Sequence, residues 1–203
     1  MNIELKKRII TSFFLLSLLA LMYFFTYILV AVVIIIAVIS WIEFYGMISK
    51  IYKKKFLKDQ FFKMLFKSIS LLYIWLLVFV ILMIVSKFPE FKIFIYYSLL
   101  ASILSDIGGL IIGKTFKGKK LTKISPNKTM SGSIGSFTFS ILLVPLFIDY
   151  LINYNLLTLS VITFFISLTS QMGDLFISFL KRKAKIKDTS NLLPGHGGLL
   201  DRI

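Results

Sequence analysis

The chain has 203 residues, of which 58% are hydrophobic, and its mean hydropathy is +0.90. Soluble domains are about 45–50% apolar, so this composition is typical of an integral membrane protein. The net charge of +15 would suggest nucleic acid in a soluble protein, but these cations lie between apolar segments, and we expect no nucleic-acid partner. The absence of cysteine excludes disulfides, zinc thiolates and cysteine nucleophiles, and a single histidine excludes a histidine-rich metal site.

Long apolar segments follow one another along the chain. A helix needs about 20 apolar residues to cross the ~30 Å hydrocarbon core of a bilayer, and the first apolar run is too long for a signal peptide. The sequence therefore predicts an all-α polytopic membrane protein with a single membrane-embedded domain over residues 1–203. About six transmembrane helices are expected, with approximate bounds 9–26, 27–48, 69–85, 91–113, 134–152 and 156–180.

The lysines and arginines predict the orientation of these helices. If the N-terminus is cytoplasmic, all of the 24 cations except Lys87 and Lys92 fall on the cytoplasmic side. Cytoplasmic loops of membrane proteins carry this excess of positive charge. We therefore expect both termini in the cytoplasm and, in a bacterium, a protein of the cell (inner) membrane whose active site faces the cytoplasm.

Two aspartates lie inside predicted spans, Asp106 in the fourth and Asp174 in the sixth. A carboxylate at membrane depth costs several kcal/mol unless it is paired, hydrated or bound to a metal, so such residues indicate function by default. Glu43 and Asp149 lie near predicted span ends, where a carboxylate is less costly, and we interpret both as structural.

Polar and small residues recur at helical spacing around the two aspartates. In the fourth span the small residues allow a neighbouring helix to approach closely, and in the sixth they form a polar stripe that includes Asp174. Together they predict a polar cavity between these spans that opens to the cytoplasm. The residues are Ser98, Ser102, Ser105, Gly109 and Gly113 in the fourth span, and Ser167, Ser170, Gln171, Asp174, Ser178 and Lys181 in the sixth.

The loop after the fourth span combines lysines with hydroxyl groups, which suit phosphate binding. Its sequence "GKT" at residues 113–115 is not a P-loop, because the upstream glycine and the preceding strand are missing. A basic loop that only sets topology is the alternative interpretation. The candidates for phosphate contacts are Ser125, Lys128, Thr129, Ser131 and Ser133.

The C-terminal segment "SFLKRKAKIKDTSNLLPGHGGLLDRI" concentrates cations, aspartates, glycines and the single histidine of the chain. Asp188 lies there among cations, and two carboxylates near phosphates, Asp174 and Asp188, would be a usual way to hold Mg²⁺. "PGHGG" requires a turned or flexible loop because glycine permits positive φ angles. His196 within it could bond a phosphate or a ribose.

This segment resembles the signature of the phosphatidate cytidylyltransferases, also called CDP-diacylglycerol synthases. That signature reads S-x-x-K-R, then K-D, then P-x-H-G-G-x-x-D-R. Further similarity lies at "SD" (105–106), "SPNKT" (125–129) and "Q-x-G-D" (171–174). The matching positions of the signature are Ser178, Lys181, Arg182, Lys187, Asp188, Pro194, His196, Gly197, Gly198, Asp201 and Arg202.

The resemblance implies a reaction and a set of roles. CTP and phosphatidic acid would give CDP-diacylglycerol and pyrophosphate, with Mg²⁺ or another divalent cation, in a site surrounded by membrane lipid. The implied catalytic residues are Asp174, Asp188, Lys181, Arg182 and Lys128. The implied metal ligands are Asp174, Asp188 and Asp106. The implied substrate-binding residues are Ser125, Lys128, Thr129, His196, Gly197, Gly198, Asp201 and Arg202, with Asp201 and Arg202 bracing the nucleotide loop.

The family pattern continues past "DRI" with another aspartate and a final apolar segment, whereas this sequence stops at Ile203. We therefore expect a C-terminally truncated member, and a truncated member without activity is a competing hypothesis. An enzyme acting on a related lipid or polyprenyl alcohol is a second competing hypothesis, and an ion or proton transporter that uses Asp106 and Asp174 is a third. The oligomeric state is left open, with a homodimer as one option.

Overall fold

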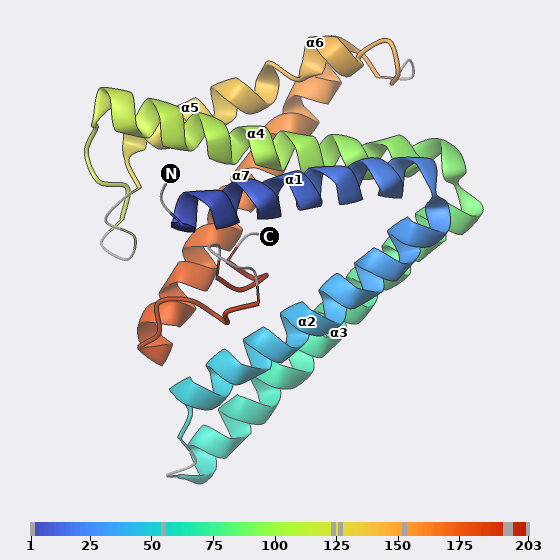
Figure 1. The fold of residues 1–203 in the computed structure, drawn as a ribbon. Helices are drawn as coiled ribbons and strands as arrows, with labels where there is room; N and C mark the ends of the chain where they lie inside the picture. Colours follow the sequence, from blue (N-terminus) through green and yellow to red (C-terminus); the bar gives the residue numbers. More distant parts are fainter. Residues whose placement is uncertain are drawn as a thin grey trace. The chain divides into compact units, whose positions relative to one another are not determined.

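A computed structural model describes residues 3–53, 56–122, 125, 128–151, 154–192 and 197–201, with the backbone alone for residues 3–9. Over these ranges the regular elements are helices, and one isolated antiparallel bridge joins Lys120 to Thr129. The chain forms two compact units, Met1–Glu90 with Leu180–Ile203, and Phe91–Phe179. The predicted all-α fold is confirmed, and the single domain stays a prediction. The elements (Figure 1) are α1 (Ile3–Phe24), α2 (Thr26–Ile51), α3 (Leu57–Lys87), η1 (Pro89–Phe91), α4 (Lys92–Phe116), α5 (Met130–Ile141), α6 (Val144–Phe147) and α7 (Leu156–Ala184).

In the first unit, α1 and α2 are separated by Phe25, whose extended backbone interrupts the helix. This residue fixes the turn that the apolar pattern could only place near residue 26. Helices α2 and α3 then run antiparallel and side by side (Figure 1). Helix α3 begins at Leu57 rather than near residue 69. The N-terminal part of α3 contains lysines, so a search for apolar runs leaves it out of the span although it is helical. One of these lysines, Lys67, places its ammonium 3.0 Å from the centre of the Tyr45 ring on α2.

In the second unit, α4 and α5 pack closely because glycines face each other across the contact. A Cβ atom added to Gly108 would lie 2.5 Å from the backbone oxygen of Gly135, and one added to Gly113 would lie 3.3 Å from the Cα of Gly132. The prediction that small residues on the fourth span permit close helix packing is therefore confirmed.

The fifth predicted span, 134–152, is wrong in detail because it contains a break. Helix α5 ends at Ile141, and the four-residue α6 contains Pro145 in its first turn. Proline lacks the N–H for an intrahelical hydrogen bond, and its ring clashes with the carbonyl four residues earlier, here that of Ile141. Taken together, Met130–Phe147 is still apolar and long enough to cross a membrane.

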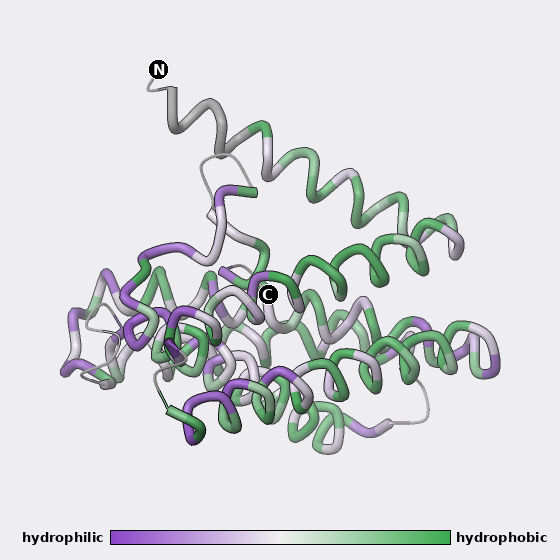
Figure 2. The backbone as a smooth tube through the Cα atoms, turned by 90° about the horizontal axis from the view of Figure 1, so that it is seen from below, coloured by the Kyte–Doolittle hydropathy of each residue, from purple (hydrophilic) through white to green (hydrophobic). Residues whose placement is uncertain are grey.

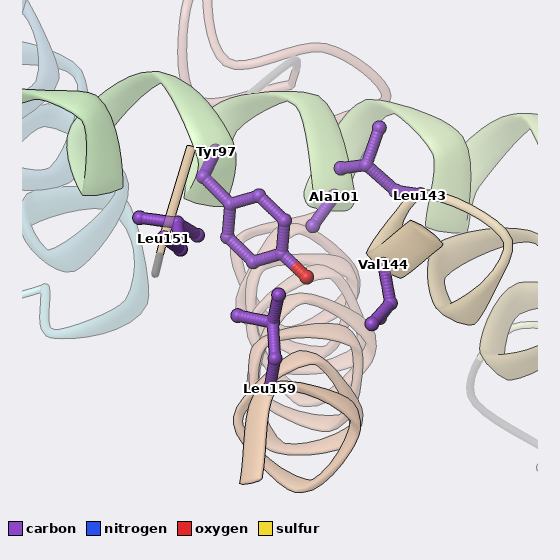
Figure 3. Close-up of a cluster of buried hydrophobic side chains, with 6 residues drawn as sticks. All are labelled: Tyr97, Ala101, Leu143, Val144, Leu151 and Leu159. Carbon is purple, nitrogen blue, oxygen red and sulfur yellow. The ribbon is translucent and has the colours of Figure 1, made fainter. Parts of the chain in front are cut away.

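The core of the second unit lies where α4, α6 and α7 meet. Tyr97 and Ala101 of α4, Leu159 of α7, and Leu143 and Val144 at the start of α6 point into one cluster together with Leu151 (Figure 3). The Tyr97 hydroxyl is buried and bonds to the Thr163 hydroxyl of α7. A buried phenol needs such a partner, so this hydrogen bond fixes how α4 and α7 are aligned.

In the described residues, five helical segments are long and apolar enough to span a membrane, and the described apolar part of α1, Ile10–Phe24, is shorter. Figure 2 shows hydrophobic stretches along the helices and hydrophilic residues mainly at their ends and connections. None of the described residues of α3 is buried by protein, as expected of a helix whose apolar side chains face lipid. The chain is an integral membrane protein, and the cytoplasmic position of its termini stays a prediction.

Candidate active site

The loop between α4 and α5 places Lys128 directly before a helix. Lys117 ends α4 in the left-handed conformation, and farther along the loop the Leu121 N–H donates to the Lys128 oxygen at 2.8 Å. The Thr129 hydroxyl then caps α5 by accepting the Gly132 N–H at 3.0 Å. Lys128 and Thr129, two of the candidates for phosphate contacts, thus lie at a helix N-terminus, which favours anions.

Lys128 forms an ion pair with Asp174 of α7. Both side chains remain accessible, at 27% exposed for Lys128 and 51% for Asp174. The structure therefore joins two residues that the sequence proposed for one site on separate grounds, a basic loop and an aspartate within a span. An accessible pair of this kind is weakly held and can exchange partners when a charged ligand binds.

The polar stripe of α7 continues from this ion pair toward the centre of the helix. Gln171 accepts a hydrogen bond from the Ser133 hydroxyl at 2.6 Å and donates to Ser167 at 3.2 Å. Ser167 in turn bonds Ser105 of α4 at 2.8 Å, and both are fully buried. The stripe predicted from helical spacing is thus an interhelical hydrogen-bond chain. At Ser105 and Ser167 the helices touch, so the cavity expected between these spans is not present at this level.

Ser125 and Asp106 are two further candidates in this unit. Ser125 is partly buried, and its backbone oxygen accepts the Lys128 N–H at 3.1 Å. Asp106 follows the buried Ser105 on α4 and is itself exposed. The substrate and metal roles implied for these two residues stay predictions.

In the other unit, Asp201 is surrounded by hydrogen-bond donors. It accepts from the Lys181 ammonium at 2.5 Å, from the Thr189 N–H at 2.9 Å and from the Gly198 N–H at 3.0 Å. Burial opposes ionisation of this carboxyl, but Lys181 and the backbone donors outweigh it and lower the pKa of Asp201 below its usual range. Lys181, implied as a catalytic residue, is paired here with Asp201.

Glu43 of α2 holds the same C-terminal segment, as a structural residue whose partners were not predicted from the sequence. Its side chain is only 7% exposed. It accepts hydrogen bonds from the hydroxyls of Thr189 and Ser190 and from the N–H groups of Leu199 and Leu200. The sequence interpretation of Glu43 as structural was based on its position near a span end, and that position gives no signal of partners so distant along the chain.

Asp188, the second implied metal ligand, is exposed at the start of this segment. A Cβ atom added to Gly197 would lie 3.4 Å from its Oδ1 atom, so the glycine backbone passes close to this carboxylate. Arg182 and Lys187 are exposed as well. Two of the implied substrate contacts, His196 and Arg202, lie outside the described residues.

The donor set suits a hard divalent cation. Asp174 and Asp188 offer accessible carboxylate oxygens, and Mg²⁺ takes only one or two carboxylates and completes its shell with water and substrate phosphates. Within the described ranges no three acidic or histidine side chains gather into a complete metal cage. Asp174 and Asp188 belong to different units, and a metal shared by them stays a prediction.

Comparison with known proteins decides the family. The model of the cytidylyltransferase family matches residues 4–203. The chain belongs to the cytidylyltransferase family. No solved structure matches it.

Several curated proteins named phosphatidate cytidylyltransferase align with half or more of the chain. A phosphatidate cytidylyltransferase of Rickettsia prowazekii is 37% identical over 160 residues, covering 71% of this chain and 69% of the relative. That of Rickettsia bellii is 45% identical over 121 residues, covering 55% and 51%, and that of Staphylococcus aureus is 43% identical over 113 residues, covering 54% and 43%. The chain thus spans about half the length of most of these relatives.

Proposed function

We propose that this protein transfers a cytidylyl group from CTP to phosphatidic acid, giving CDP-diacylglycerol and pyrophosphate for phospholipid synthesis. The observation that carries the proposal is the family match over residues 4–203, with relatives named phosphatidate cytidylyltransferase at 37–45% identity. The pairing of Lys128 with Asp174 supports it, because it brings a phosphate-binding type of cation to an accessible carboxylate.

The reaction is an in-line displacement at phosphorus. An oxygen of the lipid phosphate forms a bond to the α-phosphorus of CTP, and the bond from that phosphorus to the bridging oxygen breaks, so that pyrophosphate leaves with the electron pair. Phosphatidate is already anionic and needs no strong general base. The protein must hold two anions in line and stabilise the charge on the equatorial and leaving oxygens.

Lys128 and the start of α5 are suited to that task. A lysine ammonium acts as a point charge for phosphate, and the N–H groups at a helix N-terminus point toward an anion. In the structure the Lys128 ammonium is paired with the Asp174 carboxylate. When triphosphate binds, Lys128 can turn to the phosphate, and Asp174 then becomes available to a cation.

Mg²⁺ would be held by Asp174 and Asp188, with Asp106 as a further candidate, and it would neutralise charge on the phosphate oxygens of CTP. The exposed Arg182 can approach a phosphate with two N–H groups. His196, Gly197 and Gly198 belong to the segment proposed to enclose the nucleotide.

The membrane setting follows from the substrate and from the charges. Phosphatidic acid lies in the bilayer and CTP in the cytoplasm, so the site must lie at the cytoplasmic surface. The lysine distribution supports this orientation, with both termini in the cytoplasm of a bacterial cell membrane. Homodimerisation is kept as a proposal, because nothing in the reaction requires or excludes it.

The test is release of pyrophosphate by the purified protein in detergent, with CTP, phosphatidate and Mg²⁺, together with chromatographic identification of the lipid product. Product should require both substrates. Reactions with ATP in place of CTP and with diacylglycerol in place of phosphatidate are the controls. Folded protein that forms no CDP-diacylglycerol would contradict the proposal, and cation uptake into liposomes independent of CTP would favour a transporter.

A further inference from the structure

Glu43 connects the second helix to the C-terminal signature segment. All four hydrogen bonds described for its carboxylate come from residues 189–200, at distances of 2.5 to 3.0 Å. A carboxylate that accepts this many bonds while buried holds its donors firmly, because each bond to a charged group is stronger than a neutral one.

Asp201 holds the same segment from within. Thr189 is common to both carboxylates, since its hydroxyl oxygen lies 2.8 Å from Glu43 Oε2 and 3.0 Å from Asp201 Oδ2. A hydroxyl has one hydrogen and donates to one acceptor at a time. The other donors hold each carboxylate independently of the Thr189 hydroxyl: two backbone N–H groups and the Ser190 hydroxyl for Glu43, and two backbone N–H groups and the Lys181 ammonium for Asp201.

The two glycines of the signature fit around these carboxylates. A Cβ atom added to Gly198 would lie 2.8 Å from both Glu43 carboxylate oxygens and would also strike the Thr189 hydroxyl. Gly197 has a φ of +88° and would bring a Cβ to 3.0 Å from Asp201 Oδ2. The close approach of Glu43 thus accounts for one glycine of the signature, although Glu43 lies far outside it in the sequence.

We propose that Glu43 is a positioning residue: by holding Thr189, Ser190, Leu199 and Leu200, it places their neighbours Asp188, Gly197 and Gly198 for nucleotide and cation binding. Asp188 directly precedes Thr189, and Gly197 and Gly198 directly precede Leu199, so the groups held by Glu43 lie next to one candidate metal ligand and two candidate nucleotide contacts. The proposal rests on the proposed function for its kinetic part, whereas its structural part can be measured without substrate.

Glu43→Gln is the sharpest variant, because it keeps the size of the side chain but turns an NH₂ group toward donors that need an acceptor. Hydrogen exchange of the Leu199 and Leu200 amides should accelerate at least about tenfold, while the amides of α2 and α4 keep their rates. Glu90→Gln, the same substitution at an exposed site, is the matched control and should change neither. Thr189→Val and Ser190→Ala should each loosen the same amides without touching α2.

The kinetic readout separates positioning from general damage. In Glu43→Gln the KM for CTP should rise about tenfold or more while the KM for phosphatidate stays unchanged, because the loosened segment carries the nucleotide contacts. Partly unfolded protein would instead lower kcat with both KM values intact, and that result would overturn the proposal. So would unchanged exchange at 199–200, or faster exchange spread over all of α2.

Failure of the proposed function gives a different pattern. If the wild-type protein releases no pyrophosphate but Glu43→Gln still loosens residues 189–200 selectively, the cytidylyltransfer reaction is refuted while the hold of Glu43 on the segment stands. If the wild-type protein turns over and the loosened variant binds CTP normally, the positioning role is refuted and the reaction stands.

Discussion

Lys128 and Asp174 form an ion pair between the loop that precedes α5 and the polar stripe of α7. Each residue has a partner only as long as no phosphate or cation competes for it. The opposite charges of the pair compensate each other in this structure, and under the proposed function both members would become available together to a nucleotide and its cation.

Removing either charge of this pair should stop the reaction. We expect Lys128→Ala and Asp174→Asn each to lower kcat/KM for CTP by at least about 100-fold, because each loses a charge directed at the phosphates or their cation. Pyrophosphate release measures this. Lys119→Ala, an exposed lysine of the same loop, is the control and should retain activity. Near-normal rates in Asp174→Asn would remove that residue from the site.

A charge swap distinguishes a structural pair from a functional one. In the double variant Lys128→Asp with Asp174→Lys the ion pair can form again, so thermal stability in detergent should recover relative to the single variants. Turnover should not recover, because the cation-binding and phosphate-binding positions are exchanged. Recovery of turnover with stability would show that the pair is only structural.

Divalent cations should be required through Asp174 and Asp188. Chelation is expected to abolish turnover, and added Mg²⁺ should restore it in the wild-type protein. Asp188→Asn should fail to recover at any Mg²⁺ concentration while still inserting into membranes. Binding of Mn²⁺, measured by electron paramagnetic resonance in the presence of CTP, should weaken in both Asp174→Asn and Asp188→Asn. Undiminished binding in Asp188→Asn would exclude it as a ligand.

The contact between α4 and α5 should be intolerant of side chains. Gly108→Ala places a methyl group 2.5 Å from the Gly135 oxygen and from Phe139 Cβ, and we expect it to destabilise the protein by about 1–3 kcal/mol. Gly46→Ala meets nothing within 4 Å and should be neutral or stabilising by up to about 1 kcal/mol, because alanine favours helix. Melting in detergent compares the two, and equal shifts would refute the close packing.

The lowered pKa of Asp201 predicts a dependence of stability on acid. Lys181 and the backbone donors favour its ionised form, so its contribution is fully present above the ordinary pKa of 3.8 and is lost as pH falls through the lowered pKa. The wild-type melting temperature should therefore exceed that of Asp201→Asn above pH 4, and the difference should vanish in stronger acid. A constant difference across this range would contradict the assignment.

The local sequence pattern predicted much of the helical structure of this protein. Runs of apolar residues predicted the helices, and helical spacing predicted the stripe through Ser167, Gln171 and Asp174, because both depend on near neighbours in sequence. The bounds failed where another local rule intervened. Pro145 divides the fifth span, and the lysines of early α3 extend a helix beyond its apolar part.

Contacts between distant segments were the part that pattern could not supply. In the sequence, Glu43 cannot be distinguished from any other carboxylate near the end of a span. Only the folded structure shows its hydrogen bonds with Leu199 and Leu200. The resemblance to a family marked the glycines at 197–198 but not the side chain that makes Gly198 necessary. For Lys128 and Asp174, the sequence predicted only that both belong to one site, and it did not predict their ion pair.

The hold of Glu43 on Leu199 also sets an order of events during biosynthesis. The two residues are 156 positions apart, so a ribosome adding roughly 5–20 residues per second needs on the order of ten seconds to make the second after the first. Helix α2 is in the bilayer during that interval with a carboxylate whose donors do not yet exist, and the carboxylate must stay hydrated or protonated meanwhile. Assembly of this unit therefore waits until Leu199 and Leu200 have been made and have left the ribosome, and nascent chains that stop short of these residues should be recognisable to membrane quality control by an unsatisfied acid in their second helix.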